Sequence, residues 1–238
     1  MSYVHLRPRL AAAASLLKGD TLADVGCDHG RLCAFLLQSG SIRHAIGIDC
    51  SAPSLEKAAA LRALCGLENR WELRVGDGLS VLHPGEADIL SFCGMGGELI
   101  SSLIDAQSGI SRSASMLVMQ PMGGMQELRA YLYSRDYEIV DEMLVKDSGR
   151  IYQIIAARSG TPRPLPDGYP SGFFTFGALS LQKRDPLLIP ALQSYLSSHQ
   201  RRLTKALAKG SDPDSLRRII WQTETLIELA KGYENDEA

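Results

Sequence analysis

The feature that most constrains the fold is the alternation, over residues 21–158, of short β-rich apolar runs with helical stretches. This order is typical of βαβ units, which build a parallel sheet with helices on both faces. Five strands are predicted, at Leu22–Gly26, His44–Ile48, Trp71–Val75, Ala87–Phe92 and Met116–Gln120. Four helices are predicted between them, at Leu32–Gln38, Pro53–Cys65, Glu98–Ala106 and Gly124–Ser134. The expected architecture is a doubly wound α/β domain.

Two further β-rich runs, Glu138–Lys146 and Arg150–Ala157, predict an antiparallel hairpin that closes the sheet. After Ser159 the composition changes, and residues 161–172 hold four prolines and two glycines, which indicate a connector. Two amphipathic stretches follow, at about Pro186–Lys209 and Asp212–Lys231. The turn between them, which includes Gly210 and Ser211, predicts an antiparallel helical pair of the coiled-coil type. The expected division is residues 1–158 and residues 159–238.

Charge and cysteine content exclude several classes of protein. Asp and Glu total 27 against 25 Lys and Arg, so the chain lacks the overall basic excess usual in nucleic-acid-binding proteins. Five cysteines without a CxxC pair argue against a disulfide framework and a zinc site, and fit a reducing cytoplasm. No run reaches the roughly 20 apolar residues of a membrane-spanning helix. We expect no metal and no membrane partner, and the choice between a monomer and a weak dimer stays open.

A glycine turn follows the first predicted strand, where Gly26, Cys27 and Asp28 precede a helix. Such a turn lets a cofactor approach the backbone at the carboxyl edge of a parallel sheet. Asp28 stands where a dinucleotide fingerprint has its second glycine, and its carboxylate would repel a pyrophosphate. A cofactor without phosphates, or with a positive charge, suits this turn better. Asp24, on the strand itself, is expected to be a buried acid that accepts hydrogen bonds from backbone amides.

Two more acidic residues stand at strand ends. Asp49 ends the second strand, where a carboxylate can accept the hydroxyls of a ribose, although it could instead cap the next helix. Asp77 and Gly78 follow the third strand, where a carboxylate could read an adenine amino group. Three strand-end acids without a phosphate-binding loop favour S-adenosylmethionine over NAD or ATP.

The fourth strand ends in Cys93-Gly94-Met95-Gly96-Gly97, whose glycines leave room for a flat substrate and expose main-chain groups to it. A plain helix start would use the same residues, so this motif alone is ambiguous. Cys27, Cys50 and Cys93 each follow a predicted strand and are expected around one pocket, as small apolar fillers rather than nucleophiles or metal ligands.

Together these motifs resemble the TrmK family, the bacterial tRNA (adenine-N1)-methyltransferases that modify adenine 22. The residues that carry the resemblance are Asp24-x-Gly26-x-Asp28-His29, Asp77-Gly78-Leu79, Gly94-Met95-Gly96-Gly97, Gln120-Pro121-Met122, Arg129 and Tyr152-x-Ile154-Ile155. The likeness covers about residues 9–157, and the helical pair is similar to the family's C-terminal domain. The chain departs from the family at Cys27–Cys33, which lacks the tyrosine of the usual T-D-H-A-Y-L-P, so no aromatic residue is assigned to that loop.

The resemblance implies a class I (Rossmann-like) S-adenosylmethionine-dependent methyltransferase fold with a small C-terminal helical coiled-coil domain. It also implies S-adenosylmethionine as methyl donor and tRNA as substrate, with Asp28 facing the reacting centre. With the neighbouring cysteines added, the expected cofactor-binding residues are Gly26, Cys27, Asp28, Asp49, Cys50, Asp77, Gly78, Cys93 and Gly94.

Chemistry at N1 of adenine needs placement more than a strong base, because N1 already carries a lone pair. The methylated base is cationic, so a carboxylate would stabilise the charge as it develops, and Asp28 is the predicted catalytic residue. N1 lies on the Watson–Crick edge, so the base must be unpaired or extruded. Substrate contacts are expected from His29, Met95 and Gly96, although His29 could simply satisfy the turn.

Cations gather in the C-terminal part of this acidic chain. Residues 183–218 hold eight Lys or Arg and three Asp. We expect Arg201, Arg202 and Lys205 to contact tRNA phosphates, although a solvated helix face would show the same pattern. Near the N-terminus, Arg7 and Arg9 could add phosphate contacts at the mouth of the active site.

Two other functions fit the sequence. A class I methyltransferase acting on a small molecule or a protein would use the helical pair for dimerisation. A non-catalytic nucleoside-binding protein could retain the same fold, because a fold does not prove an activity. The three acids Asp28, Asp49 and Asp77 argue against the second alternative.

Overall fold

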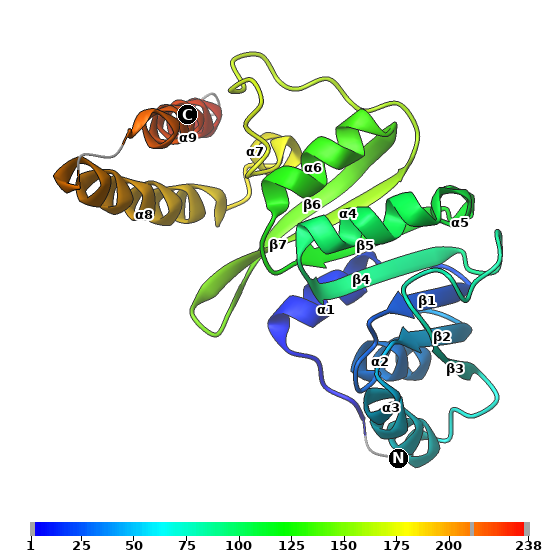
Figure 1. The fold of residues 1–238 in the computed structure, drawn as a ribbon. Helices are drawn as coiled ribbons and strands as arrows, with labels where there is room; N and C mark the ends of the chain where they lie inside the picture. The colour runs from blue at the N-terminus through cyan, green and yellow to red at the C-terminus, as the bar shows by residue number, and fades with distance from the viewer. Residues whose placement is uncertain (1–2, 210–211, 236–238) are drawn as a thin grey trace. The chain divides into compact units, whose positions relative to one another are not determined.

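The computed structural model describes residues 3–209 and 212–235 and confirms the α/β fold (Figure 1). The chain divides into two compact units, Met1–Arg163 and Pro164–Ala238. The first unit holds the sheet and the second holds the C-terminal helices. Each unit is described by itself.

Within the described residues, seven strands form one sheet in the order β3-β2-β1-β4-β5-β7-β6. Their bounds are β1 Thr21–Val25, β2 His44–Asp49, β3 Trp71–Val75, β4 Ile89–Met95, β5 Met116–Pro121, β6 Tyr137–Asp147 and β7 Arg150–Ser159. Strands β1 to β5 are parallel, and β7 pairs antiparallel with β5 and β6, which confirms the predicted hairpin. Strand β2 pairs with one side of β1 and β4 pairs with the other, so the strand order reverses between β1 and β4. In such sheets, ligands bind beyond the carboxyl ends of the strands at the point of reversal.

Helices cover both faces of the sheet (Figure 1), with α1, α2 and α3 on one face and α4, α5 and α6 on the other. Their bounds are α1 Pro8–Leu16, α2 Arg31–Ser39, α3 Ala52–Cys65, α4 Gly97–Ala106, α5 Ser108–Ser113 and α6 Met125–Ser134. Helices α1 and α5 are additional to the predicted ones. Strand β4 also differs from the prediction, because it continues past Phe92 and takes in the first residues of the glycine motif.

The core of the first unit follows from the apolar strands, which are covered on both faces as parallel strands require. Leu22, Ile48 and Phe92 are fully buried. One charged pair is buried with them, since Arg129 Nε on α6 donates to Glu142 Oε1 on β6 at 2.7 Å and both side chains are 2% exposed. Arg129 Nη2 also donates to Gln153 Oε1 on β7 at 2.7 Å. These bonds fix α6 onto the hairpin.

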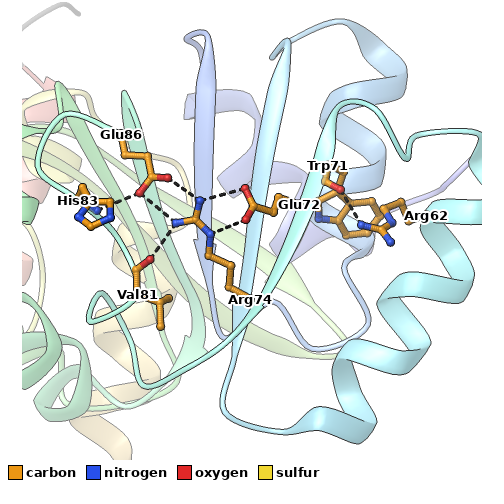
Figure 2. A network of polar contacts seen from close by, with 7 residues as sticks. All are labelled: Arg62, Trp71, Glu72, Arg74, Val81, His83 and Glu86. Carbon is orange, nitrogen blue, oxygen red and sulfur yellow. Dashed lines mark hydrogen bonds and ion pairs between the residues drawn. The ribbon is translucent and has the colours of Figure 1, made fainter.

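The edge strand β3 is held by an arginine network, which Figure 2 shows. Arg74 lies between the carboxylates of Glu72 and Glu86 and also donates to the carbonyl of Val81 at 2.8 Å. The guanidinium of Arg74 lowers the pKa of Glu86 to about 2. Through these contacts Arg74 closes the loop between β3 and β4, which begins with Gly76 and Asp77.

The second unit consists of helices α7 Ala178–Gln182, α8 Leu188–Ala208 and α9 Asp214–Asn235 after a connector without regular structure. Helix α9 packs against α8 and runs back along it, as predicted (Figure 1). The predicted stop and cap at Gly210 and Ser211 lie outside the described residues, and a coiled coil stays a prediction. Helix α7 was not predicted, and it packs against α9. Before it, Phe173 and Phe176 of the connector form an aromatic cluster with Tyr195 of α8. None of the described helices is long and apolar enough to span a membrane.

Candidate active site

A cavity of about 470 Å³ opens at the carboxyl ends of β1 and β4, where the strand order reverses. It is built from the turn after β1, the end of β4, the start of α1 and the turn after β5. The residues that line it are Arg9, Leu10, Asp24, Gly26, Cys27, Asp28, His29, Arg31, Leu32, Cys93, Gly94, Met95 and Met122. The predicted β1 turn and the predicted glycine motif therefore lie at one site.

The turn after β1 docks onto β2 through its backbone. The amides of Gly26 and Cys27 both donate to the carbonyl of Ile48, at 2.8 and 2.9 Å. Gly26 has φ +70°, and a Cβ at this position would lie 2.6 Å from Met95 Cε. Asp28 also has a positive φ, of +49°, which acidic and amide side chains tolerate better than most. Glycine at 26 thus allows the close approach of the β1 and β4 ends.

Asp49 connects this turn to the next helix. Its Oδ2 accepts from the amide of Asp28 at 3.0 Å, and its Oδ1 accepts from the amide of Ser51 at 2.8 Å. Each carboxylate oxygen keeps a second lone pair for a further donor. Asp49 is partly buried, and Cys50 beside it is exposed.

The Asp28 carboxylate lies at the cavity with 70% of its side chain exposed. Its Oδ1 is 3.4 Å from His29 Nε2 and accepts from Ser54 Oγ at 3.4 Å. Both contacts are long, so they constrain the carboxylate weakly. An acid that is held loosely at a cavity mouth can accept hydrogen bonds from an incoming ligand.

Gly94 forms a bulge in β4, because the pairing with β5 shifts register between Cys93 and Met95. It has φ +81°, and a Cβ there would meet no atom within 4 Å. The loop is bonded to the turn after β5, since the amide of Met122 donates to the carbonyl of Met95 at 2.8 Å. The amide of Gly97 likewise donates to the carbonyl of Gly123 at 2.8 Å. The glycine motif is therefore a fixed loop with open space beside its backbone.

Asp24 is buried beneath the cavity, as predicted, but the prediction of backbone amide partners is wrong. Its Oδ1 accepts from Ser91 Oγ at 2.6 Å, and its Oδ2 accepts from Cys33 Sγ at 3.6 Å. Both partners are side chains on neighbouring elements, so strand periodicity could not reveal them. Burial raises the pKa of Asp24 to about 6.

Burial also raises the pKa of the Cys27 and Cys93 thiols, and the charge of Asp24 adds to the effect. Neutral thiols are poor nucleophiles, which agrees with their interpretation as small fillers. In the part of the chain that the structure describes, no group of three or more His, Cys, Asp or Glu could hold a metal ion.

Arg9 reaches the cavity from α1. Its Nη1 lies 2.7 Å from Met122 Sδ, and its guanidinium lies 5.3 Å from the centroid of the Tyr152 ring. Arg7, one residue before α1, is exposed and does not line the cavity. Sequence reasoning did not assign Met122 or Arg31 to the cavity, because their contribution depends on how the β5 turn and α2 pack.

Asp77 and Gly78 lie beyond β3 at the same edge of the sheet but do not line the cavity, and neither do Asp49 and Cys50. Asp77 is exposed. Arg201, Arg202 and Lys205 belong to α8 of the second unit, where all three are exposed.

Comparisons with known proteins agree with this fold. Residues 6–155 match the family model described as "Methyltransferase domain". The tRNA (adenine(22)-N(1))-methyltransferase of Bacillus subtilis (strain 168) is 24% identical over 233 residues, which cover 97% of this chain and 98% of that protein.

Two solved structures share the fold of both units. The B. subtilis M1A22 tRNA methyltransferase TrmK has a TM-score of 0.82 and 24% identity, and the match covers 96% of this chain and 98% of that one. M. capricolum TrmK, in complex with the cofactor product S-adenosyl-homocysteine, has a TM-score of 0.76 and 21% identity. That match covers 96% of this chain and 97% of the M. capricolum chain.

Proposed function

This chain belongs to the methyltransferase-domain family, and from that premise we propose that it transfers a methyl group from S-adenosylmethionine to N1 of an adenine in tRNA. The observation that carries the proposal is the cavity at the β1/β4 reversal, with the loosely held Asp28 at its mouth and open space beside Gly94. The B. subtilis relative that matches nearly the whole chain is named for adenine 22, which supports that position as the target.

The residues at this edge of the sheet suit S-adenosylmethionine. The open space beside Gly94 lets a ligand approach the backbone, and the free lone pairs of Asp49 can accept ribose hydroxyls. The carboxylate of Asp28 would repel a pyrophosphate but would attract a cationic cofactor. When bound, S-adenosylmethionine supplies an electrophilic methyl group. We assign its binding to Gly26, Asp28, Asp49 and Gly94. For the far end of the ligand, beyond the cavity, we propose contacts from Asp77 and Gly78.

We propose that Asp28 accepts a hydrogen bond from the exocyclic amine of adenine and offsets the positive charge that develops on the base. No base is required at N1, because its lone pair attacks directly once the ring is held in line. The Met95 side chain and the open backbone at Gly96 would receive the flat ring, and His29 would contact its rim. The side chain of Asp28 is 70% exposed at the cavity, so its carboxylate is accessible to the ligand.

The partner we propose is tRNA, in the cytoplasm. Arg9 at the cavity, Arg7 beside it and the exposed cations of α8 supply positive charge for phosphates. We propose that a monomer is sufficient for activity, because the turn after β1, the end of β4 and the start of α1 already form the cavity. The basic residues of α8 would then serve tRNA rather than a second copy.

The test uses the purified chain with unmodified bulk tRNA and labelled S-adenosylmethionine, followed by digestion and mass spectrometry of the nucleosides. We expect N1-methyladenosine from the wild type. Asp28→Asn keeps the shape and one acceptor oxygen, and it tolerates the positive φ. Because it removes the negative charge, we expect its turnover to fall about 10- to 100-fold. Asp105→Asn, at an exposed acid near the end of α4, is the matched control and should be unchanged.

The other outcomes separate the alternatives. Binding of S-adenosylmethionine without tRNA methylation would reject the tRNA proposal in favour of a methyltransferase for a small molecule or a protein. Absence of any S-adenosylmethionine binding would reject the cofactor assignment as a whole. Methylation by Asp28→Asn at the wild-type rate would reject the role given to Asp28 while leaving the reaction in place.

A further inference from the structure

Trp221 on α9 has a position that the packing of its helix does not explain. It is 61% exposed, whereas the chain's other tryptophan, Trp71, is 1% exposed. Tryptophan is a large side chain that is highly buried on average, so this degree of exposure leaves much of the apolar surface of the indole without contact. The exposed indole is therefore a candidate contact for a partner.

The neighbours of Trp221 on the preceding turn of α9 are cationic, whereas the exposed Glu224 lies three residues after it. Helix α9 buries residues such as Thr223 and Leu226 against the rest of its unit, and Trp221 lies off that stripe. Residues three and four apart share a helix face, so the exposed Arg217 and Arg218 flank Trp221 on the preceding turn. Arg217 pairs with Asp214 at 3.2 Å.

The end of α8 and the beginning of α9 extend this positive charge. Between residues 201 and 218 there are six cations and two acids, and all are exposed: Arg201, Arg202, Lys205, Lys209, Arg217 and Arg218, with Asp212 and Asp214. One cation is held in place by a buried side chain, because Arg202 Nη1 donates to His199 Nε2 at 3.1 Å. His199 Nδ1 in turn donates to the carbonyl of Tyr195 at 2.9 Å. The positive surface is thus partly ordered before a ligand arrives.

From this juxtaposition of an exposed indole with cations we propose that Trp221 is a stacking platform for an unpaired base of tRNA, with Arg217 and Arg218 contacting the adjoining phosphates. The inference rests on the proposed function and adds a base contact to the second unit. A polyanion with exposed ring faces matches both parts of the surface, because bases stack on aromatic side chains and cations follow the backbone. A second copy of this chain would bring the same cations together across a symmetric interface, which like charges oppose.

The first test compares Trp221→Ala with Leu207→Ala, in the full chain, for binding to unmodified bulk tRNA. Leu207 is 51% exposed on the last turn of α8 and is the matched control for loss of an exposed apolar side chain. Loss of one base–aromatic stack should weaken binding about tenfold or more for Trp221→Ala only. The dependence on salt should keep its slope, because no phosphate contact is removed, whereas Arg218→Gln should lower the slope by about one.

The second test uses intrinsic fluorescence, which reports on two tryptophans. Stacking on a base should quench the emission of wild-type protein when tRNA is added, and Trp221→Phe should remove that change, because Trp71 is buried. In methylation assays Trp221→Ala should raise the KM for tRNA, while kcat at saturating tRNA and the affinity for S-adenosylmethionine stay at wild-type values.

Each remaining outcome decides the inference. If Trp221→Ala binds and methylates tRNA like the wild type, the platform is refuted and the proposed function stands. If tRNA quenches Trp221 but is not methylated, the platform stands and the proposed function fails. If Trp221→Ala instead changes the sedimentation coefficient of the free protein and leaves tRNA affinity unchanged, the indole belongs to a contact between copies and the platform is refuted.

Discussion

Gly94→Ala should lower both the folding stability, through the backbone conformation, and the affinity for S-adenosylmethionine, through the space that the new side chain fills. Gly94 has φ +81°, so a side chain there costs about 1–2 kcal/mol of folding free energy through the left-handed conformation. A Cβ at Gly94 meets no protein atom within 4 Å, so we expect no further loss from packing. The added methyl group would occupy the open space beside the cavity. Overpacking costs about 1–3 kcal/mol, which corresponds to an increase of about 5- to 150-fold in the Kd for the cofactor.

Gly40→Ala is the matched control for this prediction. Gly40 ends α2 with φ +73°, and a Cβ there also meets no atom within 4 Å, but it does not line the cavity. Urea unfolding should show similar losses of stability for both variants, and calorimetric titration should show weaker S-adenosylmethionine binding for Gly94→Ala alone. Equal affinity in the two variants would refute the assignment of this space to the cofactor.

Two further predictions concern buried charge. Glu142→Gln removes the charged partner of the buried Arg129, so urea unfolding should show a free energy of unfolding lowered by about 3–5 kcal/mol. The control is Glu138→Gln, at a half-buried acid on the same strand. A loss below about 1 kcal/mol for Glu142→Gln would contradict a dry ion pair. Burial raises the pKa of Asp24 from 3.8 to about 6. The folded state therefore holds this proton more tightly than the unfolded state does. The resulting stabilisation is fully present below pH 3.8 and is lost as the pH rises to 6. Relative to Asp24→Asn, the wild type should lose about 3 kcal/mol over this interval, and parallel pH profiles would show that Asp24 does not titrate in this way.

Much of the fold follows from local pattern, and the exceptions have physical causes. The parallel strands were predicted because each is a short apolar run between turn residues, and β1 to β5 lie where such runs occur. Helix α1 was not predicted because its Ala-rich sequence shows only weak separation of polar and apolar residues. Its packing against β5, β6 and β7, rather than its local pattern, stabilises the helix. Strand β4 is longer than predicted because pairing with β5 continues through a glycine bulge that local preference would assign to a turn.

The candidate site shows the same division between local and tertiary information. The glycine turn at Gly26 and the motif around Gly94 were predicted as one pocket, and they do line one cavity, because parallel strands present their carboxyl ends at a common edge. The side-chain partners of Asp24 lie on β4 and α2, and Met122 enters the cavity from the turn after β5. No spacing along the chain encodes these contacts, so only the packed sheet reveals them.

The net charge of −2 argues against a nucleic-acid-binding protein only if charge is spread evenly, and here it is not. Six exposed cations and two acids lie between residues 201 and 218, while acids such as Asp28 and Asp49 stand at the carboxyl edge of the sheet. A carboxylate helps at a site that takes a cationic cofactor and yields a cationic base, but it would repel phosphates along an extended contact. We propose that phosphate recognition falls mainly to the cations of the second unit, whereas the strand-end acids belong to the first unit. Neutralising Arg201, Arg202 and Lys205 should therefore lower tRNA affinity and its salt dependence without changing the affinity for S-adenosylmethionine.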